Sequence, residues 1–154
     1  MSAIEPYESD RVRRHTPPKI NARIDGDIRS SISRYAGASR ETLTRRIDEL
    51  DREWDIERIL EANAAGFSLA GLALSQIHGR RWLWLSTGVA GFLLQHALQG
   101  WCPPVSVFRR LGVRTRREIE REKYALKALR GDFQPVSEAR SARDADRVSR
   151  AVEA

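Results

Sequence analysis

The sequence predicts an all-α fold, an integral membrane two-helix antiparallel hairpin flanked by amphipathic cytoplasmic helices. Three observations predict it. Of the 154 residues 31% are charged, yet between residues 62 and 108 only Arg80 and Arg81 carry a charge. Soluble amphipathic helices keep charged residues on their outer faces. In this block, every face lacks charged residues except at the turn. Its two apolar runs, residues 62–79 and 82–102, would be about 27 and 31 Å long as helices, close to a hydrocarbon core of about 30 Å.

The chain before the hairpin divides into two segments. Residues 1–37 contain three prolines among charged residues, and we expect a flexible N-terminal arm with a weak amphipathic helix. Residues 38–61 are expected to form a charged amphipathic helix with Ser39 as its N-cap. Its apolar stripe has the spacing of a heptad seam and consists of Leu43, Ile47, Leu50 and Trp54. The stripe packs either on the protein's own C-terminal helix or on a second copy as a short coiled coil, and two heptads are too few to decide.

Small and polar residues follow one face of each hairpin helix. In the first helix they are Ala64, Ser68, Gly71 and Ser75. In the second helix they are Gly88, Gly91, Gln95 and Gln99. A turn near residues 79–81 would bring Ser68 opposite Gln95 and Gly71 opposite Gly91. We therefore expect the small residues to allow close approach of the helices and the glutamines to bond across the pair.

The flanks of the hairpin predict its orientation. Basic residues are denser beyond its outer ends than at its turn, and the positive-inside rule then predicts that both termini are cytoplasmic. Trp82, Trp84 and Trp101 fall near the expected interfaces, as in an aromatic belt. The first residues contain no apolar run, so we expect no cleavable signal and insertion through the internal helices.

After the hairpin we expect a basic juxtamembrane helix at residues 109–131 and a disordered tail at residues 132–154. Thr115 and Glu118 match a capping box, and Gly131 is a helix stop signal. Basic charge beside an apolar block favours anionic lipid head groups as partner. No aromatic or glycine-rich pattern supports nucleic acid. The side chains expected to face lipid are Arg109, Arg110, Arg114, Arg116, Arg117, Arg121 and Lys123.

The stretch LQGWCPPVSVFRRLGVRT resembles the end of the YgaP-like transmembrane domain family, a two-helix inner-membrane module of unknown function. The matching positions are Gly100, Trp101, Cys102, Pro103, Leu111, Gly112, Val113 and Thr115. The resemblance covers roughly residues 54–131 and is nearest to stand-alone bacterial proteins with longer cytoplasmic arms. It implies the bacterial inner (cytoplasmic) membrane as location. Pro104 departs from the family pattern, and with no rhodanese domain present, sulfur transfer cannot be carried over from fused relatives.

The sequence shows no enzyme. It has no paired carboxylates, phosphate loop or Ser-His-Asp set in the hairpin, and we expect no cofactor and no metal. His96 and Cys102 lie on different faces of their helix, and His78 is expected at the interface. We therefore predict a membrane anchor or scaffold, acting as a homo-oligomer through its helices. The alternative is a thiol-dependent membrane factor for sulfur or redox handling, in which Cys102 would be a reactive thiol with a pKa lowered by nearby arginines.

Overall fold

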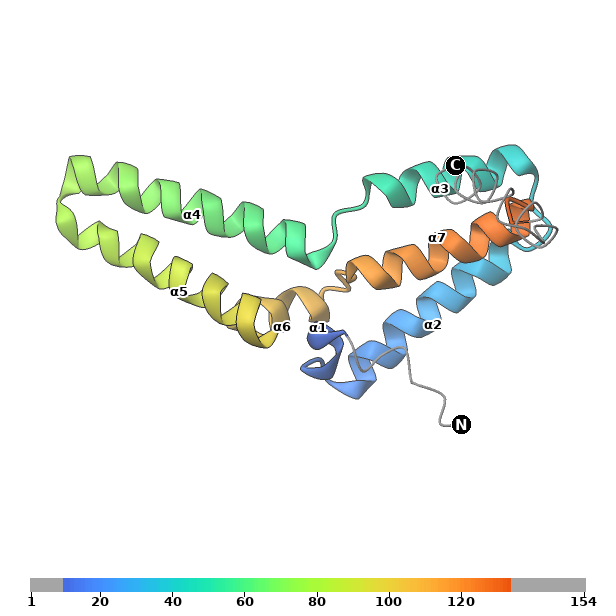
Figure 1. The fold of residues 1–154 in the computed structure, drawn as a ribbon, viewed down its shortest axis with the longest axis horizontal. Coiled ribbons are helices and arrows are strands. Elements are labelled where there is room, and N and C mark those ends of the chain that lie inside the picture. The colour runs from blue at the N-terminus through green and yellow to red at the C-terminus, as the bar shows by residue number, and fades with distance from the viewer. Residues whose placement is uncertain (1–9, 134–154) are drawn as a thin grey trace, which may run out of the picture. The chain divides into compact units, whose positions relative to one another are not determined.

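The computed structural model describes residues 10–133, and these residues are helical throughout apart from short connections (Figure 1). Most of the tail expected at residues 132–154 and the first nine residues of the expected arm lie outside the described part. The chain divides into two compact units. Of the described residues, the first contains residues 10–25 and 54–117, and the second contains residues 26–53 and 118–133. The helices are α1 (Arg11–Arg14), α2 (Pro18–Tyr35), α3 (Arg40–Arg52), α4 (Ile56–His78), the 3₁₀ turn η1 (Arg80–Trp82), α5 (Leu83–Gln99), α6 (Pro103–Arg110) and α7 (Arg116–Arg130).

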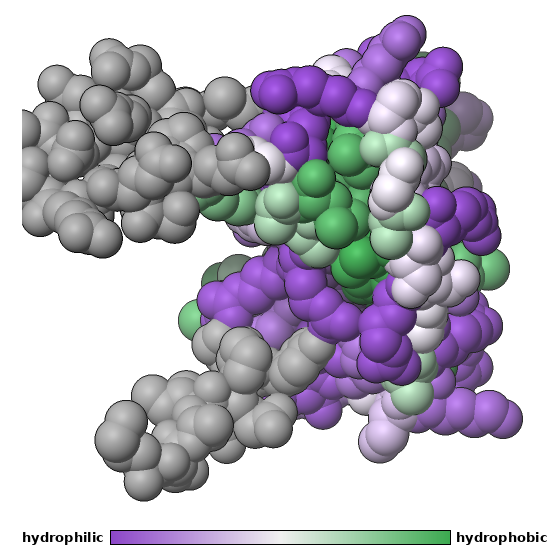
Figure 2. Space-filling model, turned by 90° about the vertical axis from the view of Figure 1, so that its right-hand side faces the viewer, coloured by the Kyte–Doolittle hydropathy of each residue, from purple (hydrophilic) through white to green (hydrophobic). Residues whose placement is uncertain are grey.

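Large aliphatic side chains hold the second unit together. The core, which we call the α3/α7 core, consists of Leu43, Ile47, Leu50, Ile119 and Leu126. Three members of the predicted stripe thus pack on the C-terminal helix of the same chain, and that interpretation is confirmed. The fourth member, Trp54, lies outside α3 and is 48% exposed. Most of the charged side chains around this core are exposed, but Glu118, Glu122 and Lys127 of α7 are buried. On the face in Figure 2, hydrophilic residues surround a smaller apolar group.

The segment predicted as one helix, residues 38–61, contains a break. Ser39 caps α3 as predicted, because its hydroxyl accepts a bond from the Thr42 amide at 3.3 Å. The helix ends at Glu53, whose backbone is extended. Asp55 then caps α4 by accepting a bond from the Arg58 amide at 2.8 Å. A second N-cap inside the predicted segment therefore starts a separate helix.

The first unit contains the α4–α5 hairpin, in which the two helices run antiparallel on either side of the turn at Gly79 (Figure 1). The two helices approach each other closely at Gly71. A Cβ atom placed there would lie 2.5 Å from the Ser86 hydroxyl and 3.1 Å from the backbone carbonyl oxygen of Trp82. The Ser86 hydroxyl donates a hydrogen bond of 2.8 Å to the carbonyl of Ser68. Small residues on α4 therefore allow the backbones to meet.

The prediction of membrane-spanning helices is wrong: within residues 10–133 no helix is both long and apolar enough to cross a membrane. The second apolar run shows why. Part of it forms η1, and Gly100 ends α5 in a left-handed conformation (φ 73°). The 17 residues of α5 are only about 26 Å long, short of a core of about 30 Å. The first helix is longer, but it begins at Ile56 and includes Glu57, Arg58 and Glu61.

The amphipathic helix predicted within residues 1–37 is present as α2, whereas residues 10–17, predicted to be flexible, form the short helix α1 and its connection to α2. Within the first unit, α1 docks against the end of α5, where the Arg11 guanidinium donates to the Ala97 carbonyl at 2.8 Å. A Cβ atom on Gly100 would lie 2.3 Å from the Cβ of Arg11. Val12 packs in a core with Ile56, Leu60, Cys102 and Val105. Because these contacts join residues distant in sequence, local composition could not reveal them.

Candidate functional site: the apolar hairpin and its cavity

Large apolar side chains are exposed along the α4–α5 hairpin. On α4 they include Phe67 (55% exposed), Leu69 (67%) and Ile77 (76%). On α5 they are Leu83, Trp84, Phe92, Leu93, Leu94 and Leu98. Because successive helical residues are about 100° apart, Phe67 and Leu69 point to nearly opposite sides of α4. The hairpin therefore presents apolar surface around much of its circumference.

The predicted packing faces have different outcomes on the two helices. On α4, Gly71 and Ser75 are buried and Ala64 and Ser68 are half-buried. Two members of this set, Ser68 and Gly71, lie against Ser86 of α5.

On α5, Gly88 and Gly91 are exposed, and a Cβ atom added to either glycine would have no other atom within 4 Å. Gln95 is half-buried and Gln99 is exposed. Ser86 takes the place opposite Ser68 that the predicted register gave to Gln95. The residues that approach Gly71 are Ser86 and, through its backbone carbonyl, Trp82, both close to the turn at Gly79.

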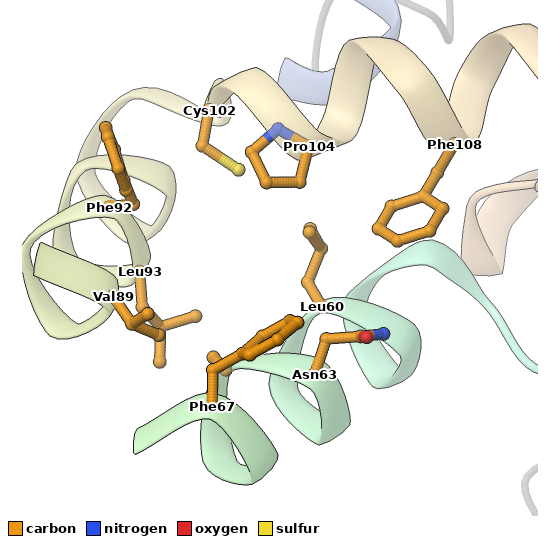
Figure 3. Close-up of a pocket in the computed structure, with 10 residues that line it drawn as sticks. Leu60, Asn63, Phe67, Val89, Phe92, Leu93, Cys102, Pro104 and Phe108 are labelled. Atoms are coloured by element: carbon orange, nitrogen blue, oxygen red, sulfur yellow. The ribbon is translucent and has the colours of Figure 1, made fainter. Parts of the chain in front are cut away.

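An apolar cavity of about 140 Å³ lies between α4, α5 and α6 (Figure 3). Leu60 and Phe67 reach it from α4, Val89 and Leu93 from α5, and Phe108 from α6. The remaining lining residues are Asn63, Ala64, Phe92, Cys102 and Pro104. Asn63 is the residue of the lining with a side-chain amide, and its Nδ2 already donates a hydrogen bond of 2.8 Å to the Ile59 carbonyl. The site is suited to a neutral, apolar occupant.

Cys102 lies at the start of α6 with its sulfur directed towards this cavity (Figure 3). The residue is only 3% exposed. Burial raises the pKa of the Cys102 thiol, and a hydrogen bond with the Val105 backbone offsets this in part. A thiol with a raised pKa stays protonated at neutral pH and is a poor nucleophile. The pKa of Cys102 is thus raised by burial, not lowered by nearby arginines as the sequence led us to expect.

Arg109, predicted to face lipid, is instead fully buried within the first unit. Its guanidinium donates to the Asn21 side-chain oxygen at 2.9 Å, the Val113 carbonyl at 3.0 Å and the Thr16 hydroxyl at 3.2 Å. These bonds join α2, α6 and the loop after α6. Arg109 is therefore a structural residue, and the prediction for it is wrong.

The other basic residues predicted to face lipid have different surroundings. Arg110, Arg116 and Arg117 are exposed, whereas Arg114, Arg121 and Lys123 are half-buried. Arg116 lies 4.0 Å from the Asp55 carboxylate, and Lys123 pairs with Asp51. The exposed members could meet an anionic surface.

The histidines of the hairpin form no metal site, since within the described residues no three His, Cys, Asp or Glu side chains come together as ligands. Burial, together with the charge of Arg11, lowers the pKa of His96. A neutral imidazole suits the apolar surroundings of α5.

Sequence reasoning missed the cavity, whose walls come from three separate helices. The nearest signal was the Cys-Pro-Pro turn, which places α6 against the α4–α5 pair. No family model, curated protein or solved structure matches this chain. The resemblance to the YgaP-like family therefore stays a prediction.

Proposed function

We propose that the protein is a non-catalytic scaffold that attaches to a lipid surface through its α4–α5 hairpin and displays its charged helices. The observation that carries this proposal is the apolar surface around the hairpin. Single exposed apolar residues are ordinary, but a large contiguous set indicates an interaction site. A lipid surface is the partner we favour because the exposed apolar set extends along both α4 and α5. Attachment in the boundary between head groups and acyl chains needs no helix that crosses the bilayer.

Charge supports an anionic membrane as the partner. Arg110, Arg116 and Arg117 are exposed, and each basic side chain near an anionic surface contributes about 1 kcal/mol of attraction. The location proposed is the cytoplasmic face of a bacterial inner membrane, with both termini in the cytoplasm.

Self-association through α5 is a second candidate for the same scaffold role. It is favoured by the open surroundings of Gly88 and Gly91, because small exposed residues allow a second helix to approach closely. The thiol-dependent alternative has less support, since burial and a raised pKa both oppose reaction at Cys102.

Vesicle flotation of the full chain tests the proposal. We expect the protein to float with phosphatidylglycerol vesicles and to bind less at high salt. Replacing two exposed hairpin residues together, Ile77→Glu and Leu94→Glu, should lower the bound fraction at least ten-fold, because burial of each aliphatic side chain contributes about 1.5–3 kcal/mol.

The matched control is Leu129→Glu in α7, a residue that is 46% exposed and should leave flotation unchanged. Wild-type protein that stays in the aqueous fraction would refute lipid attachment. Analytical ultracentrifugation separates the second candidate: Gly88→Leu should break a dimer formed through α5 and leave lipid binding intact.

A further inference from the structure

We propose that the cavity beside Cys102 binds one linear hydrocarbon chain, the acyl chain of a lipid or of a free fatty acid. This inference rests on the proposed function only for the natural source of the chain. The volume of the cavity, its lining and its exposed wall support the remainder of the inference.

The size of the cavity fits a slender apolar occupant. Its volume is about 140 Å³, and apolar cavities near 150 Å³ in other proteins take up benzene or xenon. Its wall includes Phe67 and Phe92, which are 55% and 50% exposed, so the cavity is continuous with the outer surface of the hairpin. A chain longer than the cavity can therefore extend over that surface, which a compact ring cannot do.

The lining disfavours water and charged ligands. An ordered internal water needs two to four polar partners. The polar groups of the lining are the Asn63 amide, which already bonds the Ile59 carbonyl, and the buried Cys102 thiol. No lining residue is charged. The head group of the occupant accordingly remains outside, and its methylene chain fills the cavity.

Cys102 is the single cysteine of the chain, which makes it a specific reporter for occupancy. The experiment measures the rate at which N-ethylmaleimide alkylates Cys102 in the full-length protein, followed by intact mass, with and without decanoate below its micelle concentration. We expect decanoate to slow alkylation at least five-fold. An unchanged rate in the wild-type protein would overturn the proposal.

A cavity-filling variant supplies the second arm. Ala64→Phe places a ring in the cavity, so decanoate should have no further effect on the rate. The matched control is Ala73→Phe on the exposed side of the same helix, which should behave as wild type. If Ala64→Phe fails to fold by circular dichroism, Val89→Phe fills the cavity from α5 with the same expectation. Equal protection of the filled variant would place decanoate elsewhere and refute the site.

Vesicles distinguish the sources of the chain and separate this inference from the proposed function. If phosphatidylglycerol vesicles slow alkylation in wild type and not in Ala64→Phe, the occupant is a chain of the bilayer lipid. Protection by decanoate alone assigns the cavity to free fatty acids. Protection without flotation keeps the cavity and rejects lipid attachment, whereas flotation without protection by either ligand keeps attachment and rejects the cavity.

Discussion

The α3/α7 core and the α4–α5 hairpin are both helix pairs, but they distribute their side chains in opposite ways. In the first, large aliphatic residues such as Leu50 and Leu126 are completely buried. In the second, the small residues Gly71 and Ser75 are buried, while Leu69 and Ile77 are largely exposed. Burial of apolar area stabilises the α3/α7 core, whereas the hairpin gains from close backbone contact. The difference indicates that the apolar side chains of the hairpin form an interaction surface for a partner.

The largest expected effect tests the α3/α7 core. Leu126→Ala should lower the free energy of unfolding by about 2–5 kcal/mol, because it removes buried methyl groups and leaves a cavity. Chemical denaturation followed by circular dichroism measures the change. The control, Leu129→Ala, alters a half-exposed residue of the same helix and should stay within about 0.5 kcal/mol. Equal effects of the two changes would show that α7 does not pack as described.

The next effect tests the hairpin. Gly71→Ala introduces a methyl group against Ser86 and should destabilise the hairpin by about 1–3 kcal/mol through overpacking. Gly88→Ala enters open space and should stabilise it by up to about 1 kcal/mol, because alanine favours a helix over glycine. Hydrogen exchange of the backbone amides in α4 and α5 measures the stability of the hairpin in both variants. The opposite ranking would restore the register in which Gly88 and Gly91 face α4.

The smallest effect concerns a charged pair at the end of α7. Arg130 Nε donates to both carboxylate oxygens of Asp132, at 2.9 and 3.0 Å, and this bond lowers the pKa of Asp132. A depressed pKa in the folded state stabilises the fold above the unfolded pKa, and this stability is lost as pH falls through the folded pKa.

Asp132→Asn should accordingly cost about 1–2 kcal/mol at neutral pH. The difference from wild type should shrink in acid, at pH values below about 4. Thermal unfolding at pH 7 and at pH 3 measures it. A difference that is independent of pH would mean that the carboxylate charge has no part in the pair.

The sequence predicts the elements whose signals are local. Ser39 is the N-cap of α3, and Gly131 follows the end of α7. The apolar stripe from Leu43 to Leu50 identifies the face of α3 that is buried in the core. The periodicity of α4 likewise predicts a face of small residues, of which Ser68 and Gly71 lie against α5. These features depend on residues within a few turns of each other, and helical geometry alone relates them.

The remaining features depend on contacts between distant segments. Arg109 looks like one more basic residue of a charged run, and only the approach of Asn21 and Thr16 makes it a buried structural group. The helix α5 is short because η1 precedes it and Gly100 ends it. Its length could not be predicted from the apolar run alone. The cavity requires three helices at once. The pattern of neighbouring residues in the sequence does not contain these contacts.

We propose that the exposed apolar surface of the hairpin attaches to lipid. A pair of site-specific fluorescent labels tests this attachment most directly. In a Cys102→Ala background, one protein carries Leu69→Cys in α4 and another carries Leu129→Cys in α7, each labelled with acrylodan. On addition of phosphatidylglycerol vesicles we expect the emission of the Leu69 label to shift to the blue and to be quenched by nitroxide lipids, while the Leu129 label stays unchanged. Unchanged emission at Leu69, or equal shifts at both positions, would contradict the account.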